Sequence, residues 1–361
     1  MMSFILHNIS YATQKYSASR RLYLFCSAVS SMLVLLFFFV SPLNGHSQAV
    51  DAGSDLPPNE MGSVMILMYH DIRKPESTWV RTPENFKKDL QALYDRNFRP
   101  ISLEDLINRR FDIPKGTSPV VLTFDDGTLG QFQMVDGPNG SEIASNCAVG
   151  ILERFHAAHP DFPLEATFFV NGKRPFKQSE YVVEKLNYIV TRGMDVGNHT
   201  SGHQNLRSSR YASADAIQKA IGKQAVFLEQ SLVDHPAYIV RTLALCFGQR
   251  PRRPSLLRYL VAGVFKGTSY ENAAILNVGS APSYSPLDRR FNPQSIPRIR
   301  ASESNTGGVE LYDWLRRYEK RPFERFVSDG DPSSFTVPRC MKDNVAPERL
   351  RNAAVNLVDC P

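Results

Sequence analysis

Two short groups of side chains in this sequence have the types and spacing for metal chemistry. Asp125 and Asp126 stand side by side before Gly127, and the second group runs from His199 to His203. Two imidazoles four residues apart can face one ion, and with one carboxylate they form a ligand set of catalytic zinc sites. Each group alone has a plainer interpretation, because Asp-Asp-Gly is a common turn sequence and histidine pairs also occur in surface loops. Together they predict a divalent-metal site with one position left open for water.

Both groups follow apolar segments that we expect to be β-strands. These segments are almost entirely apolar rather than alternating, which is typical of parallel strands covered on both faces. They span residues 64–69, 120–124, 166–170, 194–197, 238–245 and 274–278. Helical patterns lie between several of them and begin at Thr82, Ser102, Ser179 and Ser213. Strands that alternate with helices predict an α/β fold with a parallel sheet, either open or closed into a barrel.

Polar side chains follow the first four of these predicted strands. His70 follows the first, Asp125 and Asp126 the second, Asn171 the third and His199 the fourth. In parallel α/β folds the functional groups gather at the carboxyl ends of the strands. We therefore expect these residues, which are far apart in the sequence, to meet at one edge of the sheet.

The composition is that of a globular protein. The chain has 361 residues, of which 42% are apolar, with 42 Lys and Arg against 36 Asp and Glu. Such values exclude a disulfide-stapled miniprotein, a collagen-like fibre and a wholly disordered chain. The one dense basic cluster, Arg250, Arg252 and Arg253, lies in a Pro-rich stretch that we interpret as a solvated loop. No nucleic-acid partner is expected, because such a partner usually requires a basic patch or stripe.

The N-terminal segment has the order of an export signal. Arg20 and Arg21 precede an uncharged apolar run over residues 22–40, and small and turn-forming residues follow it. The run has 19 residues, close to the roughly 20 that a helix needs to cross a bilayer, so a retained membrane anchor is one alternative. A buried core helix is a second alternative. Residues 1–47 are therefore predicted to be an export signal or an N-terminal membrane anchor. The anchor would associate the protein with a membrane. In either case we expect the protein to be periplasmic, secreted or anchored facing outside.

Four cysteines remain beyond the N-terminal apolar run: Cys147, Cys246, Cys340 and Cys360. An oxidising compartment would allow this even number to form two disulfides, and the pairing stays open. The absence of a C-x-x-C spacing in the sequence argues against a zinc site made of cysteines.

The segments 123–127 (TFDDG) and 198–203 (NHTSGH) resemble the first two signature motifs of the polysaccharide deacetylases, the NodB-homology group of carbohydrate esterases. The resemblance covers about residues 64–300 and implies a deformed (β/α) barrel with about seven parallel strands. It makes Asp126, His199 and His203 the metal ligands and Asp125 the general base that acts on a metal-activated water. Zinc is the expected metal, with cobalt, nickel or manganese as alternatives.

Residues 243–248 resemble the third family motif, which implies that the backbone N–H of Phe247 stabilises the oxyanion. Ala244 and Cys246 stand where many members carry an arginine and a second proline, so this motif supplies no arginine to orient the base. Cys246 is interpreted as a small buried residue or a disulfide partner. Residues 296–299 resemble a closing feature of some members, and Arg298 is a candidate either to contact sugar or to fix Asp125.

The family's late histidine, its usual general acid, has no counterpart, because no histidine follows His235. Residues 68–72 (MYHDI) resemble the opening of the branch that deacetylates poly-β-1,6-N-acetylglucosamine. This likeness makes His70 the candidate acid, and a structural histidine bonded to backbone is the alternative.

The resemblance predicts a metal-dependent hydrolase that removes acetyl groups from an N-acetylated extracellular or cell-envelope polysaccharide. A non-catalytic carbohydrate-binding relative and an O-acetyl esterase of the xylan type are the alternatives. The predicted organisation is a linker over residues 48–62, a deacetylase-like barrel over 63–327 and a C-terminal extension over 328–361. The polymer and the oligomeric state stay open.

Overall fold

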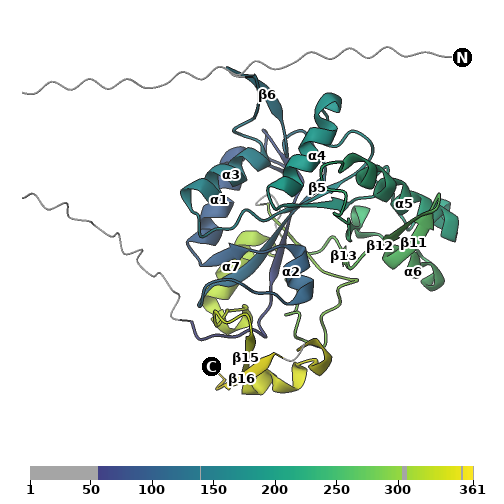
Figure 1. The fold of residues 1–361 in the computed structure, drawn as a ribbon. Coiled ribbons are helices and arrows are strands. Elements are labelled where there is room, and N and C mark those ends of the chain that lie inside the picture. Colours follow the sequence, from purple (N-terminus) through teal and green to yellow (C-terminus); the bar gives the residue numbers. More distant parts are fainter. Residues whose placement is uncertain (1–55, 139, 303–306, 351–352, 361) are drawn as a thin grey trace, which may run out of the picture. The chain divides into compact units, whose positions relative to one another are not determined.

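The structure is a computed structural model, and it describes residues 56–138, 140–302, 307–350 and 353–360 (Figure 1). The predicted export segment over residues 1–47 and most of the predicted linker lie outside the described residues. No helix in the described part of the chain is both long and apolar enough to cross a membrane.

The main sheet has eight strands, and every pairing in it is parallel. Seven of them follow the spatial order β13-β10-β9-β8-β5-β1-β14, and β4 pairs with β5 beside that path. Their bounds are β1 Met65–Tyr69, β4 Phe98–Pro100, β5 Ser118–Asp126, β8 Thr167–Val170, β9 Asp195–Asn198, β10 Thr242–Ala244, β13 Ala274–Leu276 and β14 Ile299–Arg300.

The segment that leads into β14 borders both edges of this sheet. The N–H of Ile296 donates to the carbonyl of Ile275 at 2.9 Å, and the N–H of Asn277 donates to the carbonyl of Ile296 at 2.8 Å, which adds the segment to the edge at β13. Three residues later, Ile299 pairs with Leu67 of β1. The sheet is therefore curled until one short segment joins its two ends. This is a deformed (β/α) barrel with seven parallel strands on its path, and the predicted fold class is confirmed.

Helices cover the outside of the strands (Figure 1). Their bounds are α1 Pro83–Tyr94, α2 Leu103–Asn108, α3 Ala148–Ala158, α4 Val182–Thr191, α5 Ala214–Ser231, α6 Arg258–Val261 and α7 Leu311–Lys320. The start of α1 shows how the sequence encodes them: the Thr82 hydroxyl accepts the N–H of Asn85 at 3.2 Å, and Pro83 occupies the first turn. Phe86, Leu90 and Leu93 of this helix are buried against the barrel.

The core is built around β5, whose residues are buried except at its last position. The ring of Phe124 in this strand stacks on Phe168 at 4.8 Å between centroids and on Tyr69 at 5.2 Å. Burial of each such side chain stabilises the folded state by roughly 1.5–3 kcal/mol. The central strands are thereby fixed, and their carboxyl ends become a rigid platform for polar side chains.

The predicted strand over residues 238–245 is shorter than expected, because only Thr242–Ala244 forms β10. Tyr238 uses its hydroxyl instead, which donates to Asp195 at 2.9 Å and accepts the N–H of Val196 at 3.0 Å. Four further two-stranded sheets were not predicted from the sequence. They are β2 Asp71–Ile72 with β3 Val80–Arg81, β6 Met134–Gly137 with β7 Gly140–Ile143, β11 Ala262–Phe265 with β12 Thr268–Glu271, and β15 Ser334–Pro338 with β16 Ala354–Val358.

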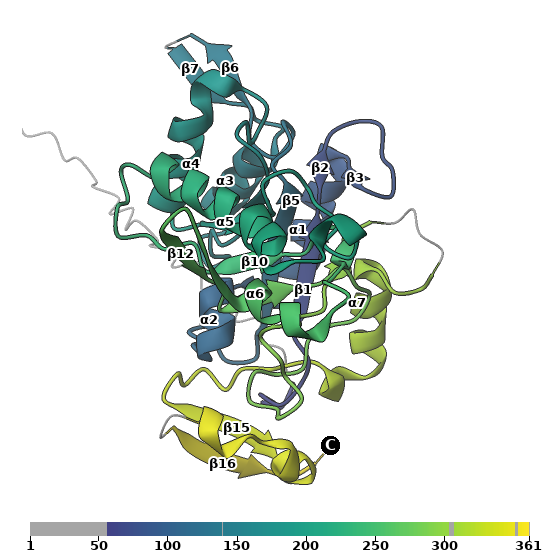
Figure 2. The same cartoon turned by 90° about the vertical axis from the view of Figure 1, so that its right-hand side faces the viewer.

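The β15–β16 pair lies at the end of the barrel opposite the β6–β7 hairpin (Figure 2). A disulfide between Cys340 and Cys360 connects the segments that follow these two strands. Phe335 and Val337 of β15 join the same hydrophobic cluster as Phe326. Cys147 and Cys246 are free and buried, so one disulfide forms among the four described cysteines.

Candidate active site

The two adjacent carboxylates at the end of β5 face different partners because the chain turns sharply there. Asp126 has φ 81° and Gly127 has φ 59°, so two successive residues adopt the left-handed conformation. A Cβ at Gly127 would lie 3.2 Å from side-chain atoms of both Pro175 and Val170, which leaves little room for any other residue. The turn leaves Asp125 buried and places Asp126 at the edge of the site.

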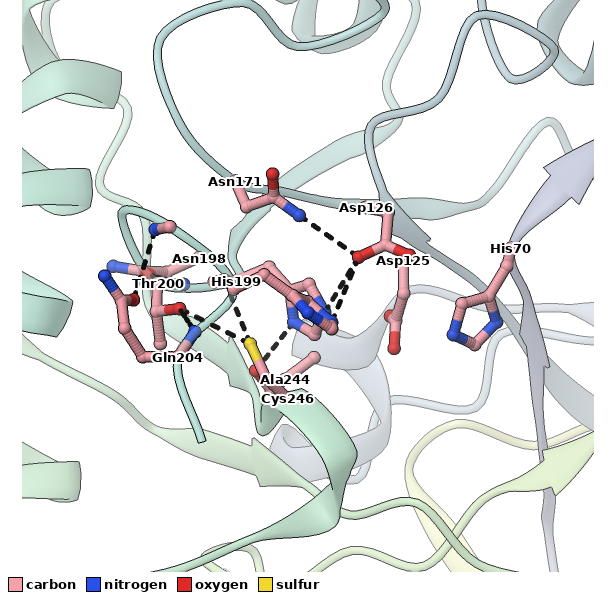
Figure 3. Close-up of polar contacts among 12 residues, drawn as sticks. His70, Asp125, Asp126, Asn171, Asn198, His199, Thr200, Gln204, Ala244 and Cys246 are labelled. Carbon is pink, nitrogen blue, oxygen red and sulfur yellow. Dashed lines mark hydrogen bonds and ion pairs between the residues drawn. The ribbon is translucent and has the colours of Figure 1, made fainter. Parts of the chain in front are cut away.

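Asp126 meets both predicted metal-binding histidines (Figure 3). Its Oδ1 lies 3.4 Å from Nε2 of His199 and 3.3 Å from Nε2 of His203. The same oxygen accepts a hydrogen bond of 3.1 Å from Nδ2 of Asn171. One carboxylate oxygen and two imidazole nitrogens therefore converge on one point.

A backbone carbonyl fixes the orientation of His199. Its Nδ1 lies 2.9 Å from the carbonyl oxygen of Ala244, which is an acceptor only, so Nδ1 carries the proton. The other ring nitrogen, Nε2, then faces Asp126. Metal-ligating histidines characteristically bond through their second nitrogen in this way. The donor set and its orientation fit a divalent metal such as zinc.

Asp126 and His203 have the protonation states that a metal ligand needs. Burial raises the pKa of Asp126, but the hydrogen bond and charge of His199 outweigh burial and bring this pKa below its usual range. Burial and the neighbouring His199 lower the pKa of His203. An ionised carboxylate and a neutral imidazole are the forms that bind cations.

The loop that carries the two histidines is held by side chains around it. Thr200 and His203 have φ values of 60° and 51°, which a residue with a Cβ adopts at a cost in free energy. The side chain of Asn198 accepts the N–H of Thr200 at 2.8 Å and donates to the carbonyl of Ile221 at 3.0 Å. These bonds attach the loop to α5, in which Ile221 lies.

Asp125 forms a buried ion pair with Arg298. Nη1 and Nη2 of Arg298 donate to Oδ1 and Oδ2 of Asp125, each at 2.7 Å, and neither side chain is more than 1% exposed. Burial raises the pKa of Asp125, but the charges of Arg298 and His199 bring it well below its usual range. The Nε of Arg298 also donates to the carbonyl of Asn277 at 2.8 Å, which anchors the arginine to the segment after β13.

His70 follows β1 and lies on the other side of the two carboxylates from His199 (Figure 3). Its ring packs against Trp79 with 4.6 Å between centroids. Gln131 donates one hydrogen bond to the carbonyl of His70 at 2.8 Å and another to the carbonyl of Asp125. Burial lowers the pKa of His70, although the negative charges of Asp125 and Asp126 act to raise it.

Phe247 lies in a short 3-10 helix, Cys246–Gly248, that follows β10. Its φ is 58°, its side chain is 56% exposed, and its ring lies 4.5 Å from that of His203. The structure thus brings all six predicted site residues to one edge of the barrel. The role of the Phe247 N–H stays a prediction.

Two supporting groups could not be found by sequence reasoning, and two others, Arg298 and Asn171, carried a partial signal. Arg298 had two candidate roles, and the structure places it on Asp125, 173 residues earlier in the chain. The carbonyl of Ala244 and the side chain of Gln131 act through contacts that no local motif encodes. Asn171 had one signal, its place directly after a predicted strand.

Residues 112–244 match the model of a family described as polysaccharide deacetylase, and the predicted resemblance is confirmed. No curated protein sequence matches the chain. Among solved structures, the Streptococcus pyogenes deacetylase PplD in complex with acetate is 18% identical, with a TM-score of 0.49 over 72% of this chain and 98% of that one. IcaB from Ammonifex degensii is 18% identical, with a TM-score of 0.46 over 67% of this chain and 93% of that one.

Proposed function

We propose, because residues 112–244 match the polysaccharide deacetylase family model, that the chain removes acetyl groups from an N-acetylated polysaccharide by metal-dependent hydrolysis. The substrate would be an extracellular or cell-envelope polymer, consistent with the export signal or anchor predicted for residues 1–47. The reaction breaks the amide bond of an acetamido sugar and yields acetate and a free amine. The likeness of residues 68–72 to the poly-N-acetylglucosamine branch favours that class of polymer.

Asp126, His199 and His203 would hold the divalent metal. Such an ion supplies an electrophile that polarises the substrate carbonyl and lowers the pKa of water to about 7. The protein's own contribution is to present one oxygen and two nitrogens from a rigid strand end and a braced loop. Zinc suits these donors, and cobalt, nickel and manganese are alternatives.

Asp125 would act as the general base. Its pairing with Arg298 keeps the carboxylate ionised although it is buried, and fixes both of its oxygens. A positioned carboxylate beside the reacting water can take up its proton as the new carbon–oxygen bond forms. Arg298 thus takes the place of the arginine that the third motif lacks.

His70 would deliver a proton to the leaving amine, which cannot depart readily as an anion. His70 lies across the carboxylate pair from His199 (Figure 3). On the opposite side, the backbone N–H of Phe247 would donate to the developing oxyanion. One edge of the barrel would thus hold a general base, a general acid and an oxyanion donor.

The convergence of Asp126, His199 and His203 on one point, beside an ionised Asp125, carries this proposal. The test is acetate release by the purified chain without residues 1–47, on N-acetylglucosamine oligomers and on acetylated xylan. We expect release from the N-acetylated oligomers, its loss with a chelator, and its recovery with zinc or cobalt.

The same assay separates the alternatives. Release only from acetylated xylan would replace the amide substrate with an O-acetyl ester. A folded, metal-loaded protein that binds the oligomers without releasing acetate would contradict the catalytic proposal and favour a carbohydrate-binding relative.

A further inference from the structure

Cys246 lies beside His199, the first histidine of the site (Figure 3). It is a free thiol, and its side chain is 1% exposed. The Sγ donates to the carbonyl oxygen of His199 at 3.3 Å and lies 3.3 Å from the hydroxyl oxygen of Thr200. A buried thiol thus contacts the backbone of one predicted ligand and the side chain of the next residue.

These two contacts matter because of the conformation of the histidine loop. Thr200 and His203 both adopt positive φ, so the loop needs bonds from outside to keep its shape. The Thr200 hydroxyl, which Cys246 touches, also accepts the N–H of Gln204 at 3.1 Å and so ties the start of the loop to its end. Cys246 is therefore placed to support the loop at its first two residues.

A thiol this close to two imidazoles is also a candidate metal ligand. Donor atoms of Cys246, His199 and His203 all lie within 4.8 Å of one another. However, Nδ1 of His199 is bonded to the Ala244 carbonyl, and Nε2 faces Asp126. The contacts of the thiol are with the loop itself, which favours support of the loop over ligation.

We propose that Cys246 is a positioning residue for the metal site, in which its thiol holds the His199 backbone and the Thr200 hydroxyl so that both histidines face Asp126. This role rests on the proposed function, since it presupposes that the site binds a metal. The S–H group is a weak donor, and a hydroxyl at the same position can replace it.

The test measures zinc and cobalt affinity by titration of the purified chain without residues 1–47, with Cys246→Ser and Cys246→Ala beside the parent chain. We expect Cys246→Ser to bind within about threefold of the parent chain, because a hydroxyl donor remains. Cys246→Ala should bind roughly 10- to 100-fold more weakly, as is typical when a group that orients a metal ligand is removed. Cys147→Ala is the matched control, because Cys147 is the other buried free thiol and caps α3; it should leave metal affinity unchanged.

The cobalt spectrum of the parent chain is a second readout that needs no variant. We expect ligand-field bands without a sulfur-to-cobalt charge-transfer band, and the same bands in Cys246→Ser. A charge-transfer band that Cys246→Ser removes would make the thiol a ligand and overturn the positioning role. Equal affinity in a folded Cys246→Ala would overturn it as well.

The outcomes also distinguish this inference from the proposed function. A parent chain that binds neither zinc nor cobalt would remove the metal site itself, and the role of Cys246 with it. Metal binding that is indifferent to Cys246 would overturn the positioning role alone.

Discussion

The two sides of the site are built in opposite ways. On the metal side, Asp126 meets two histidines that come from one loop of five residues after β9. On the proton side, Asp125 of β5 lies between an arginine that immediately precedes β14 and a histidine that follows β1. The two histidines of the metal side are local in the sequence, whereas the proton side depends on closure of the barrel.

The two sides of the site therefore depend on different features of the fold. The metal side requires a correct strand end and a loop in a costly conformation, held by groups such as Asn198 and the Ala244 carbonyl. The proton side requires the segment around Arg298 to reach across the barrel, so that Nη1 and Nη2 of the arginine meet Asp125. Changes on one side should therefore affect metal binding, and changes on the other should affect turnover with the metal still bound.

The largest effect is expected from the metal side. His199→Ala removes a buried ligand and should reduce bound metal to background and turnover by roughly a thousandfold or more, since a metal supplies several kcal/mol and each 1.36 kcal/mol is tenfold in rate. Metal content and acetate release measure this. His235→Ala is a matched control, because His235 contacts Thr191 on another part of the barrel. Full metal occupancy in folded His199→Ala would contradict the assignment of this side.

On the proton side, Arg298→Met should lower turnover by about two to three orders of magnitude, within the range of acid–base effects. Metal affinity should change little. Without the arginine, burial dominates and raises the pKa of Asp125, so the base is protonated at higher pH. The acidic limb of the pH–rate profile should therefore move to higher pH.

Arg298→Lys keeps one positive charge and should recover part of the rate. Because loss of one partner from a buried pair costs roughly 3–5 kcal/mol, thermal unfolding must be measured beside the kinetics. An acidic limb that stays in place in folded Arg298→Met would show that the arginine does not set the ionisation of the base.

His70→Gln should lower turnover on N-acetylated oligomers by about a hundredfold, the lower end of the range for a general acid. The loss should be smaller on p-nitrophenyl acetate, whose leaving group departs without a proton. Metal content should stay the same. Equal losses on both substrates would return His70 to a structural role beside Trp79.

Phe247→Ala should have the smallest effect, because the proposed donor is the backbone N–H and alanine retains it. We expect turnover to stay within about threefold, even though the ring lies against His203. Steady-state kinetics on the oligomers measure it. A loss of turnover beyond about thirtyfold would show that catalysis depends on the aromatic ring and not on the backbone N–H.

The same contrast explains how much could be predicted from the sequence. The parallel strands, the caps at Thr82 and Ser213 and the metal-side residues follow from local patterns, and the fold class and the resemblance to the deacetylase family were predicted correctly. Arg298 was left with two roles, because its contact depends on how the sheet curls and not on spacing. The four two-stranded sheets and the shortened β10 were missed, since strands of two to five residues carry little periodicity.

The most direct test of this division of labour compares two neighbouring carboxylates. Asp125→Asn and Asp126→Asn are measured in parallel for bound zinc and for acetate release, with thermal unfolding as the check on folding. The account predicts that Asp125→Asn keeps the metal and loses turnover, and that Asp126→Asn loses both. Loss of zinc from a folded Asp125→Asn, or normal turnover by Asp126→Asn, would contradict it.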